Sequence, residues 1–267
     1  MTPGFHRHPN GGGLVADTAH VDDTAYIGKY CVVYDQGKVL QNAEIRGMAR
    51  ITCNAVIAGN AIVQDDAHVS GDALVTDSAI ISDSARVYGN SKILEFVEIS
   101  DSACVRGRSV LSGNVKISNH AHISDARISD YVKIYGDSNV DGAIVSGAAQ
   151  VFGSAQVGHG TNITGNVKVY ERACIGYLND CIDDDSEFFR QFPGRRDIVI
   201  DQLISFDANE MRRGLGSNVR IFDNVAVYGD AYISGSVQIS GEAHVCGYSK
   251  IVDCNVTECC INEPEPR

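Results

Sequence analysis

Residues 59–90 read GNAIVQDDAHVSGDALVTDSAIISDSARVYGN, and an aliphatic residue occurs in this stretch at every sixth position. These positions are Val63, Val69, Val75, Ile81 and Val87. An amphipathic helix would need apolar spacings of three and four, and a half-buried strand would need strict alternation. Neither period explains the stretch by itself, so each six-residue unit must combine more than one local structure.

Alternation is nevertheless present inside each unit. In the unit AHVS, Ala67 and Val69 fall on one side of an extended chain, and His68 and Ser70 fall on the other. A Gly-Asp or Asp-Ser pair follows such units and is typical of a turn. Each unit therefore predicts one very short strand and one corner. Such strands can bury their inner side chains only by stacking on copies of themselves.

The same period covers most of the chain. The inward aliphatic recurs from Val15 to Ile175, with one residue missing before Ile128 and another before Val145, and it resumes at Ile221. With three units per coil, the repeat predicts one elongated domain of roughly a dozen coils. The predicted segments are an N-terminal cap at 1–14, β-helix coils at 15–175, an inserted loop or helix excursion at 176–218, further coils at 219–255 and a C-terminal cap or tail at 256–267.

This unit, an aliphatic residue followed by turn-forming residues, a small residue and a variable one, resembles that of the hexapeptide-repeat family. Its A-x-V-x-G/D-x style is most similar to the bacterial and phage acyltransferases of the YdcK type. The resemblance implies an all-β fold, a left-handed parallel β-helix with triangular coils. The left hand comes from the resemblance, because the general rule for parallel crossovers favours the right-handed form. The resemblance also implies a homo-oligomer, with a trimer favoured.

Composition agrees with a narrow prism. The chain has 267 residues, 27 glycines, five prolines and no tryptophan, and its formal net charge is −12. This charge disfavours binding to nucleic acid or to an anionic membrane, because phosphates would be repelled, although a local basic patch can still hold a small anion. No signal peptide or membrane-spanning stretch is recognisable, so a cytoplasmic location with reduced cysteine thiols is expected.

Alignment of residues about 18 apart sorts the outward side chains onto three faces. We name one of them the basic face; it carries a column of Arg50, His68, Arg86 and His122 and, beside it, Tyr34, Tyr88 and Arg106. Guanidinium groups bind phosphate in a bidentate manner, imidazole takes a proton near neutral pH, and tyrosine stacks on a base. The face therefore predicts a ligand-binding site for a small anion. The alternative is a set of solvated side chains with no ligand.

The other two faces differ from the basic face. One carries an apolar strip, which we expect to be a subunit interface because a contiguous strip of this length is rarely left exposed. The strip consists of Leu40, Val56, Ala58, Leu74, Leu94 and Val110, and Lys38 and Lys92 interrupt it. The third face gains Tyr135, Phe152 and Tyr170 in successive coils, and stacked aromatics of this kind commonly stabilise a sheet.

Two hypotheses for function follow. The resemblance implies an acyltransferase with acyl-CoA as donor and a histidine as general base, and the candidate catalytic residues are His122 and His120. We favour His122 because it shares the column of the basic face. The alternative is a non-catalytic binding or scaffold protein that holds a nucleotide-like anion on the basic face or between subunits. No metal is expected, because His120 and His122 are the only close histidine pair within the coils and no third ligand lies at a suitable spacing.

Overall fold

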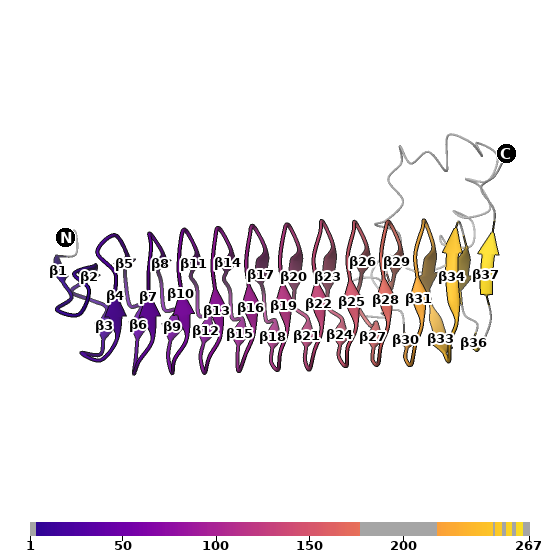
Figure 1. The fold of residues 1–267 in the computed structure, drawn as a ribbon, viewed down its shortest axis with the longest axis horizontal. Coiled ribbons are helices and arrows are strands. Elements are labelled where there is room, and N and C mark those ends of the chain that lie inside the picture. The colour runs from indigo at the N-terminus through magenta and orange to yellow at the C-terminus, as the bar shows by residue number, and fades with distance from the viewer. Residues whose placement is uncertain (1–3, 177–217, 248, 253–254, 258–259, 264–267) are drawn as a thin grey trace, which may run out of the picture.

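The chain folds into a left-handed parallel β-helix, a prism in which short strands stack along one axis (Figure 1). The computed structural model describes residues 4–176, 218–247, 249–252, 255–257 and 260–263. Every element within these ranges is a β-strand. The all-β fold class is therefore confirmed. The excursion predicted at 176–218 lies, except for its two end residues, outside the described residues, as does half of the predicted tail at 256–267.

The strands form three sheets, which we call A, B and C, of 13, 12 and 12 strands. Sheet A contains β1 (Phe5–Arg7), β2 (Leu14–Ala16), β5 (Val32–Val33), β8 (Arg50–Ile51), β11 (His68–Val69), β14 (Arg86–Val87), β17 (Cys104–Arg106), β20 (His122–Ser124), β23 (Asn139–Asp141), β26 (Gln156–Val157), β29 (Cys174–Ile175), β32 (Tyr232–Ser234) and β35 (Lys250–Val252). Sheet B contains β3 (His20–Val21), β6 (Lys38–Val39), β9 (Val56–Ile57), β12 (Leu74–Val75), β15 (Lys92–Ile93), β18 (Val110–Leu111), β21 (Arg127–Ile128), β24 (Ile144–Val145), β27 (Asn162–Ile163), β30 (Asn218–Ile221), β33 (Ser236–Ser240) and β36 (Asn255–Thr257). Sheet C contains β4 (Tyr26–Ile27), β7 (Glu44–Ile45), β10 (Ile62–Val63), β13 (Ile80–Ile81), β16 (Glu98–Ile99), β19 (Lys116–Ile117), β22 (Lys133–Ile134), β25 (Gln150–Val151), β28 (Lys168–Val169), β31 (Ala226–Val227), β34 (His244–Gly247) and β37 (Cys260–Glu263).

The core is the column of inward aliphatic residues that the period of six predicts. Val69 pairs in register with Ile51 on one side and Val87 on the other, and all three side chains are fully buried. An alanine two positions earlier, such as Ala67, is buried as well. Each coil thus adds a layer of small and branched side chains to one continuous interior, because a strand of two residues cannot bury them alone.

Acidic residues hold the corners together. Asp83 and Asp101 have positive φ angles of 57° and 58°, a left-handed conformation that short polar side chains tolerate better than most. A carboxylate oxygen of Asp83 accepts a hydrogen bond from the Asp101 backbone N–H at 3.1 Å, and Asp101 accepts one from the Asn119 N–H at 2.8 Å. Each corner therefore binds the corner of the next coil, which gives much of the acidic composition a structural role.

The helix continues in register across the long interruption of the repeat. Strand β30 pairs with β27, and Ile221 lies opposite Ile163, so the coils after the interruption extend the same three sheets. The two shortened units are absorbed in the same way. Arg127 lies opposite Val110, 17 rather than 18 residues away, without a break in sheet B.

The first coil is covered by the N-terminal residues. Strand β1 pairs with β2 in the antiparallel direction, unlike the other pairs among the described strands. Residues of the connection supply partners to the open edge: the Gly13 N–H donates to the Ile27 carbonyl at 2.9 Å, and the Asn10 side-chain amide donates to the Ala25 carbonyl at 2.9 Å. This arrangement satisfies backbone groups that would otherwise invite edge-to-edge association.

No helix suited to crossing a bilayer occurs within the part of the chain that the structure describes.

Candidate functional site

The structure brings the residues of the basic face together on sheet A as a single column. His68 lies opposite Arg50 and Arg86 in neighbouring strands, Arg86 lies opposite Cys104, and Cys104 lies opposite His122. Neighbouring parallel strands are about 4.8 Å apart, so these outward side chains repeat at that interval along the axis. Tyr34, Tyr88 and Arg106 follow two residues after column positions and form a second column, because alternate residues of a strand share one face.

The cations of this face are not neutralised by nearby acids. Arg50, Arg86 and Arg106 are exposed, and within the described residues none of them forms an ion pair with a carboxylate. By contrast, Arg46 on sheet C pairs with Glu44, and the Arg172 guanidinium binds Asp230 through two hydrogen bonds of 2.6 and 2.8 Å. A group of unpaired guanidiniums on a protein of net charge −12 is a local reversal of sign.

The pKa of His68 reflects this positive environment. Its side chain is half-buried, and its Nε2 lies 3.0 Å from the Thr52 hydroxyl oxygen. Burial, followed by the charges of Arg50 and Arg86, lowers the pKa of His68 below its ordinary value of 6.5. The imidazole is therefore neutral at pH 7 and acts in this column as a hydrogen-bonding group between two guanidiniums.

Cys104 also belongs to this column, between Arg86 and His122, although it was not among the predicted site residues. The thiol is almost completely buried and donates a hydrogen bond to the Tyr88 hydroxyl at 3.5 Å. This hydrogen bond, with burial as a second cause, raises the pKa of the Tyr88 hydroxyl although Arg106 opposes the shift. Tyr88 therefore stays neutral at neutral pH, and the contact with Cys104 holds its hydroxyl toward the first column, where it can contact a ligand.

The two candidate catalytic histidines differ in their surroundings. His120 is on a corner, and its Nδ1 lies 3.3 Å from the Asp137 carboxylate, which would hold the ring in one tautomer and leave Nε2 available. His122 is exposed on the basic face next to Cys104, and among the described residues no carboxylate pairs with it. The position of His122 places a possible base beside the proposed anion site, whereas the Asp137 carboxylate gives His120 the orientation that a base needs.

Tyr34 lies at the N-terminal end of the basic face and already has an aromatic partner. Its ring packs edge-on against Phe5 of β1, with 5.4 Å between the ring centroids. Tyr34 therefore already contacts an aromatic ring of the N-terminal strand, whereas Tyr88 lies among the cations of the basic face.

The apolar strip runs along sheet B as expected from the 18-residue alignment. Leu74 lies opposite Val56 and Lys92, and Lys92 lies opposite Val110. The three aliphatic side chains are each only partly buried within the single chain, so they present a ribbon of apolar surface that Lys92 interrupts. Arg127 lies opposite Val110 and ends the ribbon there, and Ile144, which is 45 % exposed, lies beyond Arg127 in the same column.

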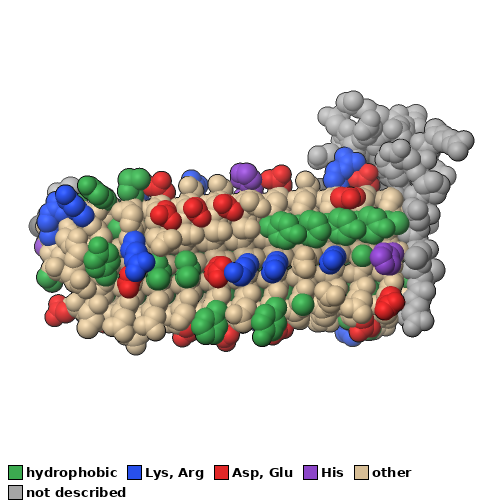
Figure 2. All heavy atoms as spheres, in the orientation of Figure 1, with side chains coloured by type: hydrophobic (Ala, Val, Ile, Leu, Met, Phe, Trp, Pro, Cys, Tyr) green, Lys and Arg blue, Asp and Glu red, His purple; other side chains and the backbone are tan. Residues whose placement is uncertain are grey.

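Sheet C carries an uninterrupted stack of aromatic rings, which we call the aromatic ladder. It contains Tyr135, Phe152, Tyr170 and Tyr228, with centroid separations of 4.9, 4.9 and 4.8 Å and interplanar angles of 4°, 2° and 10°. It forms the row of hydrophobic side chains along one half of the face shown in Figure 2. The sequence indicated the first three members. The fourth follows the interruption, and only the continued register of the coils adds it.

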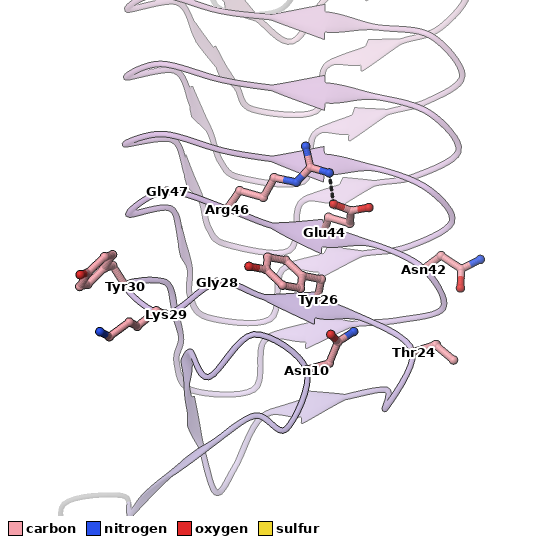
Figure 3. Close-up of a pocket in the computed structure, with 10 residues that line it drawn as sticks. All are labelled: Asn10, Thr24, Tyr26, Gly28, Lys29, Tyr30, Asn42, Glu44, Arg46 and Gly47. Carbon is pink, nitrogen blue, oxygen red and sulfur yellow. Dashed lines mark ion pairs between the residues drawn. The ribbon is translucent and has the colours of Figure 1, made fainter.

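A hollow of about 730 Å³ lies at the other end of sheet C (Figure 3). Tyr26, Gly28, Lys29, Tyr30 and Arg46 are among the residues that line it. The Lys29 ammonium lies 5.4 Å from the centre of the Tyr30 ring, and Arg46 is paired with Glu44. None of the predicted site residues lines this hollow. Because its arginine is neutralised, it offers an anion less charge than the basic face does.

Among the described residues, the side chains that could ligate a metal ion lie apart, and the cysteines differ in their bonding state. Within the described ranges, no three His, Cys, Asp or Glu side chains gather closely enough to hold a metal ion. Cys31, Cys53, Cys104 and Cys246 are free thiols, whereas Cys174 is disulfide-bonded. The expectation that all the cysteines are reduced is therefore wrong at Cys174, since the spacing of cysteines in a repeat does not show which partner the fold brings near.

These features define the class of protein: a parallel β-helix repeat protein with a cationic column on one sheet. No protein-family model matches this sequence, and no curated protein matches it.

Proposed function

We propose that the chain is a hexapeptide-repeat protein of the YdcK type that binds an elongated anionic ligand, of the acyl-CoA class, along the basic face of sheet A. The observation that carries this proposal is the column of guanidiniums without carboxylate partners among the described residues. A polyanion that lies parallel to the axis meets a donor at each strand spacing, and charged hydrogen bonds of this kind are the strong ones.

The reaction that fits such a ligand is acyl transfer. Arg86 and Arg106 would hold the phosphates, and Tyr88 would contact the base. A histidine, His122 or His120, would remove the proton from the acceptor's hydroxyl or amine. The acceptor then attacks the thioester carbonyl, the bond from carbon to sulfur breaks, and the proton passes to the departing thiolate. A cytoplasmic location, as expected from the sequence, belongs to the same proposal, because acyl-CoA is an intracellular donor.

The second candidate is binding without turnover. The observation that favours it is the lack, within the described part of the chain, of a carboxylate that orients His122. A scaffold that holds a nucleotide-like anion would need the cations of the basic face and no base.

The decisive experiment compares binding and turnover in the same variants. In Arg86→Ala/Arg106→Ala, calorimetry with CoA should show weaker binding by about 1.5–3 kcal/mol for each charged hydrogen bond lost. Arg127→Ala/Arg220→Ala removes the same charge from sheet B and should leave the affinity unchanged. Equal affinity in the two double variants would refute the basic face as the binding site.

Turnover is measured by the release of CoA thiol with a panel of amines and alcohols as acceptors. His122→Ala should retain CoA binding and lose turnover, and His120→Ala tests the second histidine in the same way. If wild type binds CoA and releases no thiol with any acceptor, the binding protein is the correct description and the acyltransferase proposal fails.

We also propose that the apolar strip on sheet B is a subunit contact and that the assembly is a trimer. Leu74→Arg would place an unpaired charge inside that contact and weaken association by several kcal/mol. Sedimentation should show smaller species for this variant. Ile80→Arg puts the same charge on an outward aliphatic of sheet C and should leave the assembly unchanged. A Leu74→Arg protein that sediments like wild type would place the contact elsewhere.

A further inference from the structure

The aromatic ladder is closed at one end and open at the other. At the C-terminal end, the Tyr228 ring meets His244 edge-on, with 6.5 Å between centroids, and the buried Cys246 takes the next position of the column. At the other end, the ladder stops at Tyr135. The preceding coil has Ser118 in the aligned position, because Lys116 lies opposite Lys133 and each is followed two residues later by the ladder position. Figure 2 shows the row of rings ending there, in the middle of the face.

The position over Ser118 has the dimensions of one more ring, and we call it the open rung. The rings of the ladder repeat at 4.8–4.9 Å, which is the spacing of the coils themselves. A serine side chain is too short to fill the space that a ring would occupy. Ser100 and Ser82 continue the same column, so they place no bulky group beneath the open rung. The face of Tyr135 that points away from Phe152 therefore has no aromatic partner within the chain as described.

Polar groups border the open rung on both sides. On one side lies the column of Lys116 and Lys133, two cations on neighbouring strands. Lys116 is paired with Glu98 at 2.6 Å, whereas Lys133 is exposed and makes no ion pair with any described residue. On the other side is the corner with His120 and Asp137, whose side chains lie 3.3 Å apart. A ligand in the open rung would thus meet a flat apolar ring, one unneutralised ammonium and a polar corner.

We propose that the open rung binds a mononucleotide, whose base is a planar heteroaromatic ring linked through the ribose to an anionic phosphate. The base extends the ladder by stacking on Tyr135, since every base offers a π-face at the required spacing. The phosphate lies toward Lys133, the cation on that side that pairs with no described acid. This site is on sheet C and is separate from the basic face on sheet A, so it stands whether or not the proposed acyl transfer does.

The site is tested with AMP as the probe and proton NMR as the readout. Stacking shifts the adenine protons upfield, and the shift should saturate with AMP concentration. Ser118→Leu fills the open rung with a side chain that cannot stack as a ring does, and it should weaken AMP binding about tenfold or more. Ser82→Leu makes the same change two coils away in the same column and should bind AMP as wild type does.

Three further titrations distinguish the parts of the proposal. Ribose 5-phosphate, which has the charge and no aromatic base, should bind at least tenfold more weakly than AMP. Lys133→Ala should weaken AMP binding and leave adenosine binding unchanged. Repeating the AMP titration in Arg86→Ala/Arg106→Ala removes any nucleotide held by the basic face, so binding that persists there belongs to sheet C.

The proposal is wrong if Ser118→Leu and Ser82→Leu bind AMP equally in the Arg86→Ala/Arg106→Ala background, if that background binds no AMP, or if ribose 5-phosphate binds as well as AMP. Failure of CoA binding or of thiol release, by contrast, bears only on the basic face. The two sites can therefore fail separately.

Discussion

The basic face of sheet A and the aromatic ladder of sheet C are built in the same way, but the neighbouring side chains within them interact in opposite ways. In both, the β-helix repeats an outward side chain at one coil spacing. In the ladder, each ring attracts the next, and Tyr135, Phe152 and Tyr170 stack in parallel at 4.9 Å, which matches the spacing of the coils. In the basic face, Arg50 and Arg86 lie on either side of His68, and their charges lower its pKa.

The difference indicates which column the fold needs and which it tolerates. A ladder of rings stabilises the sheet on which it stands, and only its end is left for a ligand. A column of like charges contributes no stability of its own, because neighbouring cations on adjacent strands repel each other. The proposed anionic ligand would account for its presence on an otherwise acidic prism.

Phe152→Ala should give the largest effect on this comparison. The substitution removes two stacked contacts, with Tyr135 and with Tyr170, and each aromatic pair is worth about 0.5–1.5 kcal/mol beyond the area it buries. The free energy of unfolding, measured by chemical denaturation, should fall by about 1–3 kcal/mol. The matched change in the charged column, Arg86→Ala, should alter stability by less than about 0.5 kcal/mol. Equal losses would contradict the view that only the ladder supports the fold.

The salt concentration should have the next largest effect, because it should change ligand affinity at one region and not at the other. Screening shortens the Debye length from about 30 Å at 0.01 M salt to about 3 Å at 1 M. The affinity of the basic face for CoA should therefore fall several-fold over this range, whereas adenosine, which is neutral, should keep its affinity for the open rung. Calorimetry and NMR titration at two salt concentrations measure both. A CoA affinity that is independent of salt would mean that the guanidiniums do not hold it.

The smallest expected effect is a change in the pKa of His68. Burial first, and then Arg50 and Arg86, hold its folded-state pKa below the ordinary 6.5. The folded protein thus binds this proton less readily than the unfolded chain does. Stability from this group is present above pH 6.5 and is lost as the pH falls from there through the folded-state pKa. Arg86→Ala removes one cause, so the pKa of His68 in an NMR titration should rise toward 6.5; an unchanged pKa would leave burial and Arg50 as its causes.

The fold was predictable because its rule is local. An aliphatic residue at every sixth position and an alanine two before it, as in Ala67 and Val69, specify which side chains point inward, and both are fully buried. The corners were predictable as turns from their Gly, Asp and Ser residues. The bond from the Asp83 carboxylate to the Asp101 N–H was not predictable from the unit alone, since it joins residues 18 apart in sequence.

The candidate site could be predicted only in part. The 18-residue alignment placed Arg50, His68 and Arg86 in one column, and the register confirms that placement. The alignment also contained Cys104, but a cysteine among cations gives no obvious signal until its contact with Tyr88 is seen. The ligand roles of these residues stay predictions.

The sequence alone determined the coil, the inward set and the columns of outward side chains, because a strict period converts separation along the chain into position in space. Only the tertiary structure decided what each outward side chain meets. It brought Tyr228 against Tyr170 across 57 intervening residues, left Arg86 without an acid among the described residues while giving Arg172 one, and ended the ladder at Tyr135. The reason is physical: inward burial repeats identically in each coil, whereas an outward contact depends on the particular side chains that two neighbouring coils present to each other.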